Sequence, residues 1–325
     1  MPPVDVLLTG PMMPVVVESL ASRFTLHRLW EAADRGALLS EIGPRIRGIA
    51  TSGGHGPVGA DLIDRLPKLE IIANFGVGYD NVDASHAAKR SVIVTNTPDV
   101  LNEEVADTAV GLLLATIRQF PQADRYLREG RWLEKPFPLT ATLRNRKAGI
   151  VGLGRIGKAV AKRLAAFDVE IAYHGRHRQD GVPYPYYPTV TALAEAVDIL
   201  IVITPGGSST RHLINAEILR ALGPNGVLIN VARGSVVDEQ ALIDALRAKT
   251  ILSAGLDVFE NEPQVPRELI EMEHVVLLPH VGSASIHTRN AMGQLVVDNL
   301  VSWFEGKGPL TPVGETPWPA RAPDI

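Results

Sequence analysis

The sequence predicts an α/β protein of two domains, each built on a parallel sheet covered by helices. Short apolar runs alternate with amphipathic stretches along most of the chain, which is typical of parallel strands joined by helical crossovers. This pattern is interrupted once, near residues 97–102, and then begins again. A length of 325 residues is sufficient for two separate cores.

The first series of elements precedes the interruption. Apolar runs predict strands at Val4–Leu8, Gly48–Thr51, Ile71–Phe75 and Val92–Asn96. Helical patterns lie between them, at Val15–Arg23 and Gly59–Leu66. The proline after Thr97 disfavours helix there, and Asn102 is a suitable cap for the next element. We expect that element to be one long helix over Glu103–Glu129.

The second series begins after this helix and is the more regular of the two. Its predicted strands are Ala148–Val151, Glu170–Tyr173, Ile199–Ile203, Val227–Asn230, Ser253–Leu256 and Val275–Leu278. An amphipathic helix then follows over about Ser285–Phe304. The tail Gly308–Ile325 contains five prolines, so we expect it to be irregular.

The division into domains follows from how much chain each sheet has available. The first series is too short to cover its own sheet, so we expect the last helix to return to it. The first domain is then residues 1–100 plus 285–325, and the second domain is residues 101–284. Two crossovers between domains make a natural hinge, and we expect the active-site cleft between them.

Composition excludes several classes of function. The chain has 32 basic and 36 acidic residues, a net charge of −4, which argues against nucleic acid as a partner. The lack of cysteine excludes disulfides, thiolate catalysis and cysteine-bound zinc. The N-terminus does not resemble a signal peptide, and no apolar run approaches the roughly 18 residues that span a bilayer. We expect a cytoplasmic protein with no membrane partner.

A glycine-rich loop, Gly152-Leu-Gly-Arg-Ile-Gly157, follows a predicted strand and opens an amphipathic helix over Ile156–Phe167. In this context Gly152 permits a tight turn, Gly154 permits close approach of a pyrophosphate, and Gly157 permits packing of the helix on the strand. The phosphates would lie at the helix N-terminus, where free N–H groups favour anions. The predicted contacts are Gly152, Leu153, Gly154, Arg155, Ile156 and Gly157. The alternative is a glycine-rich turn that binds nothing.

The next predicted strand ends in Tyr173-His-Gly-Arg-His-Arg178. Enzymes that use NAD usually carry an acidic residue here, which binds the ribose 2′-hydroxyl. This segment has none; Gly175 brings no negative charge, and Arg176 is suited to a 2′-phosphate, with His177 and Arg178 adding positive potential. We therefore predict NADP as cofactor, with NADPH preferred over NADH. The alternative is that the charges are solvated and either cofactor is accepted.

Three polar residues follow successive strands of the second series: Arg233, Glu262 and His280. Reduction of a 2-oxo acid needs a cation for the carboxylate, a group that polarises the carbonyl, and a proton donor. Arg233 serves the first two needs. His280 is the candidate acid, since an imidazole titrates near ~6.5, and a Glu262 carboxylate beside it would favour its protonated form.

Each of these residues alone has an ordinary explanation. Arg233 would be a surface ion pair, Glu262 would start a turn, and His280 would be structural. Their joint occurrence at the carboxyl edge of one nucleotide-binding sheet favours the chemical interpretation. The other histidines show no metal-binding spacing such as HExxH, so we expect no metal.

These motifs resemble those of the D-2-hydroxyacid dehydrogenase family, and the resemblance covers nearly the whole chain. It extends to Asn74-Phe-Gly-Val-Gly-Tyr-Asp-Asn81, Asn96-Thr-Pro-Asp-Val-Leu101 and Glu104-Val-Ala-Asp-Thr-Ala109. It is strongest to the NADPH-preferring branch of glyoxylate/hydroxypyruvate and hydroxyphenylpyruvate reductases, whose small residue followed by arginine matches Gly175–Arg176. The resemblance implies Rossmann-like or flavodoxin-like domains. It also implies reduction of glyoxylate or hydroxypyruvate to glycolate or D-glycerate.

The resemblance also implies roles for single residues. Arg233 would bind substrate, His280 would donate the proton, and Glu262 would be its partner. Backbone amides around Gly53, Gly54 and Gly78 would hold the carboxylate, with Ser283 as a further contact. Further cofactor contacts would be Thr204, Pro205, Val231, Ala232, Arg233, Asp257 and His280. The family forms homodimers through the second domain, and Trp132 would reach the neighbouring pocket; the alternative is an ordinary interface aromatic.

Differences from two related enzymes argue against their activities for this chain. The chain lacks the regulatory domain of some phosphoglycerate dehydrogenases, and it has Glu262 where formate dehydrogenases have glutamine. Two other interpretations stay open. One is a reductase of bulkier aromatic keto acids such as hydroxyphenylpyruvate. The other is a non-catalytic, dinucleotide-sensing protein like the corepressors that share this fold.

Overall fold

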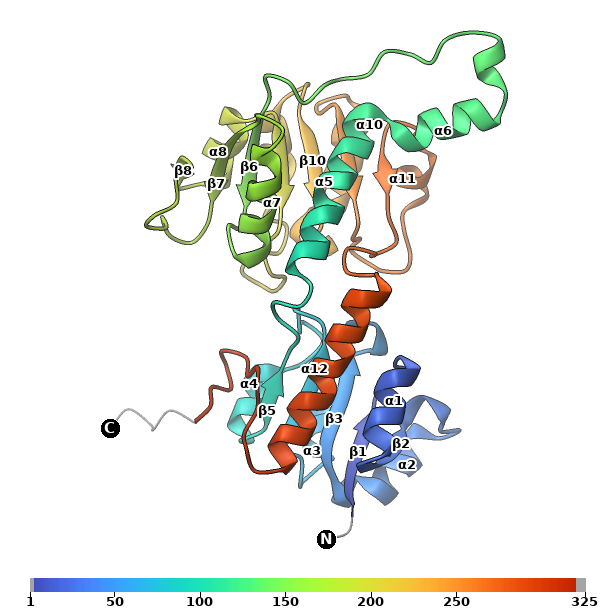
Figure 1. The fold of residues 1–325 in the computed structure, drawn as a ribbon, viewed down its shortest axis with the longest axis vertical. Coiled ribbons are helices and arrows are strands. Elements are labelled where there is room, and N and C mark those ends of the chain that lie inside the picture. The colour runs from blue at the N-terminus through green and yellow to red at the C-terminus, as the bar shows by residue number, and fades with distance from the viewer. Residues whose placement is uncertain (1–2, 320–325) are drawn as a thin grey trace. The chain divides into compact units, whose positions relative to one another are not determined.

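The computed structural model describes residues 3–319, which form two compact units. One unit contains the chain up to Leu101 and again from Ile286; the other spans Asn102–Ser285. The first unit therefore combines the blue N-terminal and red C-terminal parts of the ribbon (Figure 1). Each unit has its own parallel sheet, which confirms the predicted fold class.

The first unit has a five-stranded parallel sheet in the order β2-β1-β3-β4-β5. Its strands are β1 (Val4–Leu8), β2 (Phe24–Arg28), β3 (Ile46–Ser52), β4 (Ile71–Phe75) and β5 (Ile93–Thr95). Its helices are α1 (Pro14–Ala21), α2 (Arg35–Ile42), α3 (Ala60–Asp64), α4 (Ala84–Lys89) and α12 (Ile286–Phe304). The four predicted strands are confirmed. The sequence analysis missed β2, α2 and α4.

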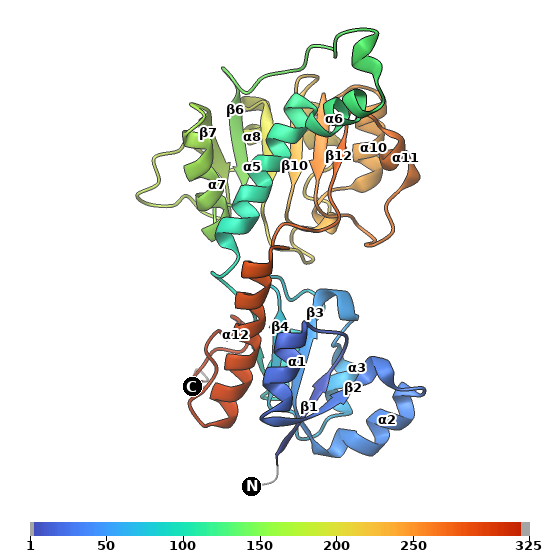
Figure 2. The ribbon, with the colours of Figure 1, turned by 45° about the vertical axis from the view of Figure 1, so that its right-hand side comes forward.

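Helix α12 packs on the sheet of the first unit, against β4 and α1 (Figure 2). Val296, Val297 and Leu300 share a buried cluster with Val6 and Leu8 of β1. Helices α2, α3 and α4 cover the opposite face, where Leu39, Ile63 and Ala87 belong to a second cluster. Because these apolar side chains are buried against the first sheet, α12 belongs to this unit although it lies near the end of the chain.

The tail after α12 is irregular as far as it is described, and it lies along the edge strand β5. The Val313 N–H donates to the Val94 carbonyl at 2.9 Å, and the Asn96 N–H donates to the Thr311 carbonyl at 3.3 Å. The predicted irregular tail extends to Ile325, and its last six positions, 320–325, lie outside the described residues.

The second unit has a seven-stranded parallel sheet in the order β12-β11-β10-β9-β6-β7-β8. Its strands are β6 (Lys147–Val151), β7 (Glu170–His174), β8 (Tyr186–Tyr187), β9 (Ile199–Val202), β10 (Val227–Asn230), β11 (Ser253–Leu256) and β12 (Val276–Leu277). The strand order reverses at β6, between β7 and β9. In this architecture, ligands bind outside the carboxyl ends of the strands at such a reversal.

Helices cover both faces of this second sheet. They are α5 (Asn102–Arg118), α6 (Phe120–Arg128), α7 (Arg155–Ala165), α8 (Val190–Ala196), α9 (Ala216–Leu222), α10 (Glu239–Arg247) and α11 (Arg267–Glu271). Helices α5 and α7 pack against each other, while α8, α9 and α10 contribute to one large core with the strands. Among residues 3–319, no helix is both long and apolar enough to cross a membrane.

The prediction of a single helix over Glu103–Glu129 is wrong. Helix α5 ends at Arg118, Gln119 adopts a left-handed conformation with φ 52°, and α6 begins at Phe120. Pro121 provides the reason: it has no N–H to bond the carbonyl of Ile117, and its ring clashes with that carbonyl in a continuous helix.

Candidate active site

The glycine loop joins β6 to α7, and each of its glycines meets a different constraint. Gly152 has φ 102°, and a side chain there would lie 3.0 Å from the Ile203 carbonyl oxygen. A side chain at Gly157 would lie 2.4 Å from the Gly152 carbonyl oxygen. At Gly154, by contrast, nothing lies within 4 Å of the added carbon. Close approach of a pyrophosphate requires such open space, and α7 begins at Arg155, directly after Gly154.

The loop after β7 begins beside the glycine loop. Val151 pairs with His174 across the sheet, and the Gly152 N–H donates to the His174 carbonyl at 2.9 Å. Arg176, His177 and Arg178 are all exposed. A cationic loop therefore follows the strand next to the pyrophosphate position, where a 2′-phosphate would be bound.

Thr204 and Pro205 follow β9, on the other side of β6. A side chain at Gly152 would come within 3.1 Å of the Thr204 Cγ2, so these residues adjoin the glycine loop. The Thr204 hydroxyl is buried and has no hydrogen-bond partner among the described residues. A buried hydroxyl of this kind is suited to a polar group of a bound nucleotide.

Arg233 follows β10, in a turn built by Asn230. The buried Asn230 amide donates from Nδ2 to the Arg233 carbonyl at 3.1 Å, and its Oδ1 accepts from the Ala232 N–H at 3.1 Å. The Arg233 Nη1 donates to the Ala232 carbonyl at 2.7 Å. Val231 and Ala232 are buried. The expected cofactor contacts of Val231 and Ala232 stay a prediction.

Glu262 and His280 form an ion pair between the segments that follow β11 and β12. The His280 Nδ1 lies 2.7 Å from Glu262 Oε2, and the Phe259 N–H donates to Glu262 Oε1 at 3.0 Å. Burial opposes ionisation of Glu262, but the bonds from His280 and Phe259, with the charges of His280 and Arg233, lower its pKa below the usual value. An ionised acceptor requires the proton on Nδ1, so this bond does not use Nε2.

Asp257 holds the segment that carries His280. This carboxylate is 2% exposed. Its two oxygens accept from the Val281 N–H at 2.7 Å and the Gly282 N–H at 2.8 Å. The His280 N–H donates to the Asp257 carbonyl at 2.9 Å, and His280 has φ 54°. Burial raises the pKa of Asp257 despite the bonds from Val281 and Gly282. The expected contact of Asp257 with the cofactor stays a prediction.

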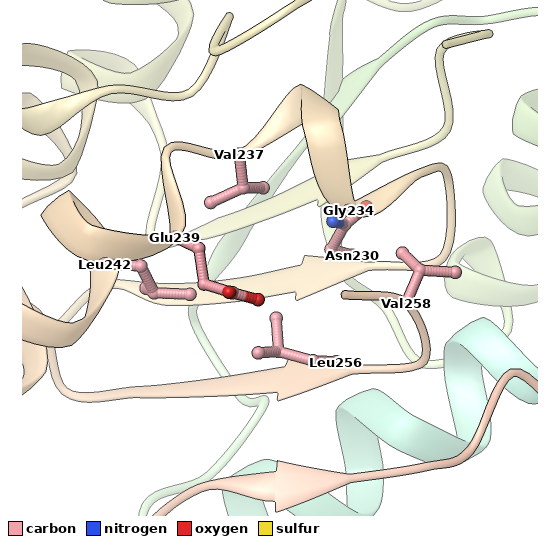
Figure 3. Close-up of a pocket in the computed structure, with 7 residues that line it drawn as sticks. All are labelled: Asn230, Gly234, Val237, Glu239, Leu242, Leu256 and Val258. Atoms are coloured by element: carbon pink, nitrogen blue, oxygen red, sulfur yellow. The ribbon is translucent and has the colours of Figure 1, made fainter. Parts of the chain in front are cut away.

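Glu239 joins the Arg233 segment to the Glu262 segment, a role that the sequence analysis did not identify. Its carboxylate points into a small pocket lined by Asn230, Gly234, Val237, Leu242, Leu256 and Val258 (Figure 3). Glu239 Oε2 accepts from the Glu260 N–H at 3.2 Å, and burial raises the Glu239 pKa. A side chain at Gly234 would lie 1.9 Å from the Phe259 carbonyl, so the two backbones are in direct contact.

The first unit places the predicted carboxylate-binding glycines in loops after its strands. Gly53 and Gly54 follow β3, both exposed, and nothing lies within 4 Å of a side-chain carbon added to either. The Gly78 carbonyl accepts from Asn74 Nδ2 at 3.0 Å. The Asn81 Nδ2 donates to the Ser52 carbonyl at 3.2 Å. Asparagine side chains therefore bond to both loops, and Gly53 and Gly54 are exposed.

Trp132 and Ser283 are two further predicted substrate contacts. Trp132 lies in a short 3-10 helix after α6, and 66% of its surface is exposed. Ser283 is partly buried, one residue beyond the Gly282 amide that Asp257 holds. Within residues 3–319, no group of three or more His, Asp or Glu side chains is arranged to hold a metal ion.

A dinucleotide loop on a parallel sheet, with an arginine and a carboxylate–imidazole pair at the carboxyl ends of its strands, defines a dinucleotide-dependent dehydrogenase. The sequence model described as "D-isomer specific 2-hydroxyacid dehydrogenase, NAD binding domain" matches residues 110–282. The chain therefore belongs to the D-isomer specific 2-hydroxyacid dehydrogenase family. This confirms the resemblance found in the sequence.

Individual relatives cover nearly the whole chain. Glyoxylate/hydroxypyruvate reductase A of Arabidopsis thaliana is 47% identical, over 95% of this chain and 99% of that protein. Hydroxyphenylpyruvate reductase of Plectranthus scutellarioides is 46% identical, over 95% and 99%. Among solved structures, the NADPH-dependent glyoxylate/hydroxypyruvate reductase of Sinorhizobium meliloti, in complex with NADP and malonate, has a TM-score of 0.93 and 55% identity. That match covers 98% of this chain and 99% of the other.

Proposed function

We propose that the chain is an NADPH-dependent reductase of small 2-oxo acids. It converts glyoxylate to glycolate and hydroxypyruvate to D-glycerate. The observation that carries this proposal is the 2.7 Å Glu262–His280 pair, which lies at the same sheet edge as Arg233. A cation and a held imidazole are the two groups that reduction of a 2-oxo acid requires from the protein.

The reaction follows from these residues. NADPH supplies the hydride when it is bound. Arg233 binds the substrate carboxylate and stabilises negative charge on the carbonyl oxygen. His280 donates its Nε2 proton to that oxygen, while Glu262 holds the ring through Nδ1 and favours the charged form. The backbone amides around Gly53, Gly54 and Gly78 bind the carboxylate as well, with Ser283 as a further contact.

The preference for NADPH rests on the loop after β7. Gly175 and the exposed Arg176, His177 and Arg178 offer positive charge and no carboxylate. A 2′-phosphate gains charge-assisted hydrogen bonds there that NADH cannot form. The reductase of Sinorhizobium meliloti, 55% identical, is NADPH-dependent and was crystallised with NADP. The remaining cofactor contacts that we propose are the backbone of Val231 and Ala232, together with Thr204, Pro205 and Asp257.

An aromatic substrate is the second candidate, because the hydroxyphenylpyruvate reductase of Plectranthus scutellarioides is almost as similar as the Arabidopsis enzyme, at 46% identity. A dinucleotide sensor is less well supported, since a sensor does not need the Glu262–His280 pair. A carboxylate whose pKa is shifted by a hydrogen-bonded imidazole is typical of a functional site.

We further propose a homodimer formed through the second unit. The surface from α6 onward exposes large apolar side chains: Phe120, Leu127, Trp132, Leu133 and Leu139 are 51%, 55%, 66%, 94% and 102% exposed. Apolar side chains gathered along one exposed segment are typical of an interface. Trp132 belongs to this surface, whether or not it reaches a neighbouring active site. A cytoplasmic location stays a prediction.

The test is the loss of reduced-nicotinamide absorbance with purified protein. Glyoxylate, hydroxypyruvate and hydroxyphenylpyruvate are each supplied with NADPH and with NADH. Rapid oxidation of NADPH with a small keto acid supports the proposal, and faster turnover of hydroxyphenylpyruvate favours the second candidate. A protein that binds NADPH but turns over no keto acid refutes the enzymatic proposal and favours a sensor.

A further inference from the structure

Gln179 connects the loop after β7 to the glycine loop. Its Nε2 donates to the Leu153 carbonyl at 2.7 Å, in the middle of the glycine loop. Its backbone N–H donates to the Tyr173 hydroxyl at 2.8 Å. Tyr173 is 1% exposed and lies in β7, so its hydroxyl is a fixed anchor. One residue thus joins two loops and a buried strand.

The other end of the same loop is also held. The Tyr186 hydroxyl donates to the Gly175 carbonyl at 3.3 Å. The rings of Tyr186 and Tyr173 lie 5.4 Å apart, and the Tyr173 N–H donates to the Pro185 carbonyl at 2.9 Å. The exposed cationic residues at positions 176–178 therefore lie between two fixed points, one at Gly175 and one at Gln179.

This arrangement matters because the two loops bind different parts of one cofactor. The glycine loop binds the pyrophosphate, and the loop after β7 binds the 2′-phosphate. A bond between Gln179 and Leu153 fixes the spacing of the two sites before the cofactor arrives. A loop ordered in advance loses less conformational entropy on binding, so the phosphate contacts contribute more to affinity.

We propose that Gln179 is a positioning residue that determines the preference for NADPH over NADH. It touches no part of the substrate and acts through Arg176 and Arg178, whose placement relative to the glycine loop it fixes. The inference rests on the proposed NADPH-dependent function. NADH lacks the 2′-phosphate and makes no use of that placement, so its affinity depends much less on Gln179.

The test compares Gln179→Ala with wild type by calorimetric titration with NADPH and with NADH. We expect the Kd for NADPH to rise roughly five- to tenfold, which is what loss of one good hydrogen bond produces, and the Kd for NADH to change less than about twofold. Tyr186→Phe removes the bond to Gly175 but keeps the ring, and we expect a smaller change in the same direction. Gln240→Ala, at an exposed glutamine of α10, is the matched control.

A second measurement needs no cofactor. Trypsin cleaves after Arg176 and Arg178 only when the loop opens, so cleavage there should be faster in Gln179→Ala than in wild type or Gln240→Ala. Equal loss of NADPH and NADH affinity, or unchanged affinity for both with unchanged cleavage, would overturn the role of Gln179. A wild-type protein that binds both cofactors equally would refute the proposed cofactor preference itself, and the inference with it.

Discussion

The loop at Gly234 in the second unit and the loop at Gly53–Gly54 in the first both follow a strand, yet they use glycine in opposite ways. A side chain at Gly234 would lie 1.9 Å from the Phe259 carbonyl, whereas nothing lies within 4 Å at Gly53 or Gly54. In one loop, glycine lets two backbones touch, which brings Arg233 close to the Glu262 segment. In the other, it leaves backbone open to a ligand. The packed loop at Gly234 positions a charged side chain, and the open loop at Gly53–Gly54 presents backbone amides to a ligand.

The largest expected effect follows from the packed region, where the charged side chains perform the chemistry. We expect His280→Ala to lower kcat by about 10²-fold or more, because the proton donor is lost. Steady-state oxidation of NADPH with glyoxylate measures this. Gly54→Ala is the comparison from the open loop, where we expect KM to rise more than kcat falls. Normal kcat in His280→Ala would remove this residue from the mechanism.

The two glycine loops can be compared directly by their stability. We expect Gly234→Ala to lower the free energy of unfolding by roughly 3 kcal/mol, because the added methyl forces backbone apart. Gly54→Ala should change it by less than about 0.5 kcal/mol, as is usual for an open surface position. Urea unfolding of both variants at neutral pH gives the answer. Equal free energies of unfolding for Gly234→Ala and Gly54→Ala would contradict the difference in packing between the two loops.

Exchange of charge in the cationic loop tests the cofactor preference. We expect Arg176→Asp to raise the KM for NADPH at least ~10-fold, because a charge-assisted bond to the 2′-phosphate becomes a repulsion. The KM for NADH should fall or stay unchanged, so that the preference is reversed. Kinetics with NADPH that are untouched by this change would refute the assignment of Arg176.

The smallest expected effect concerns pH. The pKa of Glu262 is lowered in the folded protein, so its ionised form stabilises the fold. That contribution is complete above the ordinary carboxyl pKa of ~4.3 and is lost as pH falls through the lowered value. Wild type should therefore lose stability faster than Glu262→Gln between about pH 5 and pH 3. Glu195→Gln, at an exposed position of α8, is the control. If stability fell with pH equally in wild type and Glu262→Gln, the role of the Glu262–His280 bond would be contradicted.

Much of the fold was predictable because its strands are apolar runs of ordinary length. Two strands were missed for a physical reason. β2 carries the polar residues Thr25, His27 and Arg28 at a sheet edge, and β8 is only two residues long. The break after Arg118 was not predicted although Pro121 signals it in the sequence; the helix that follows, α6, is mostly polar and buries Tyr126.

The residues of the candidate site also fall into those that the sequence predicts and those that it does not. Arg233, Glu262 and His280 follow detectable strands, and parallel strands end at one edge, so their grouping was predictable. The supporting roles were not, although the family resemblance had pointed to Asp257 as a cofactor contact. Asp257, Glu239 and Gln179 act by bonding to backbone groups distant in the sequence, and a backbone N–H or carbonyl has no signature in the residue types around it.

The most direct test of the account is a comparison of Arg233→Ala with wild type, with glyoxylate varied at saturating NADPH. The account predicts a higher KM and a lower kcat, with kcat/KM reduced roughly 10²-fold or more, because one guanidinium both binds the carboxylate and stabilises the developing charge. The Kd for NADPH, measured by calorimetry, should change less than kcat/KM does. An unchanged kcat/KM would contradict the account, because the arginine at the edge of the sheet would then take no part in the reaction.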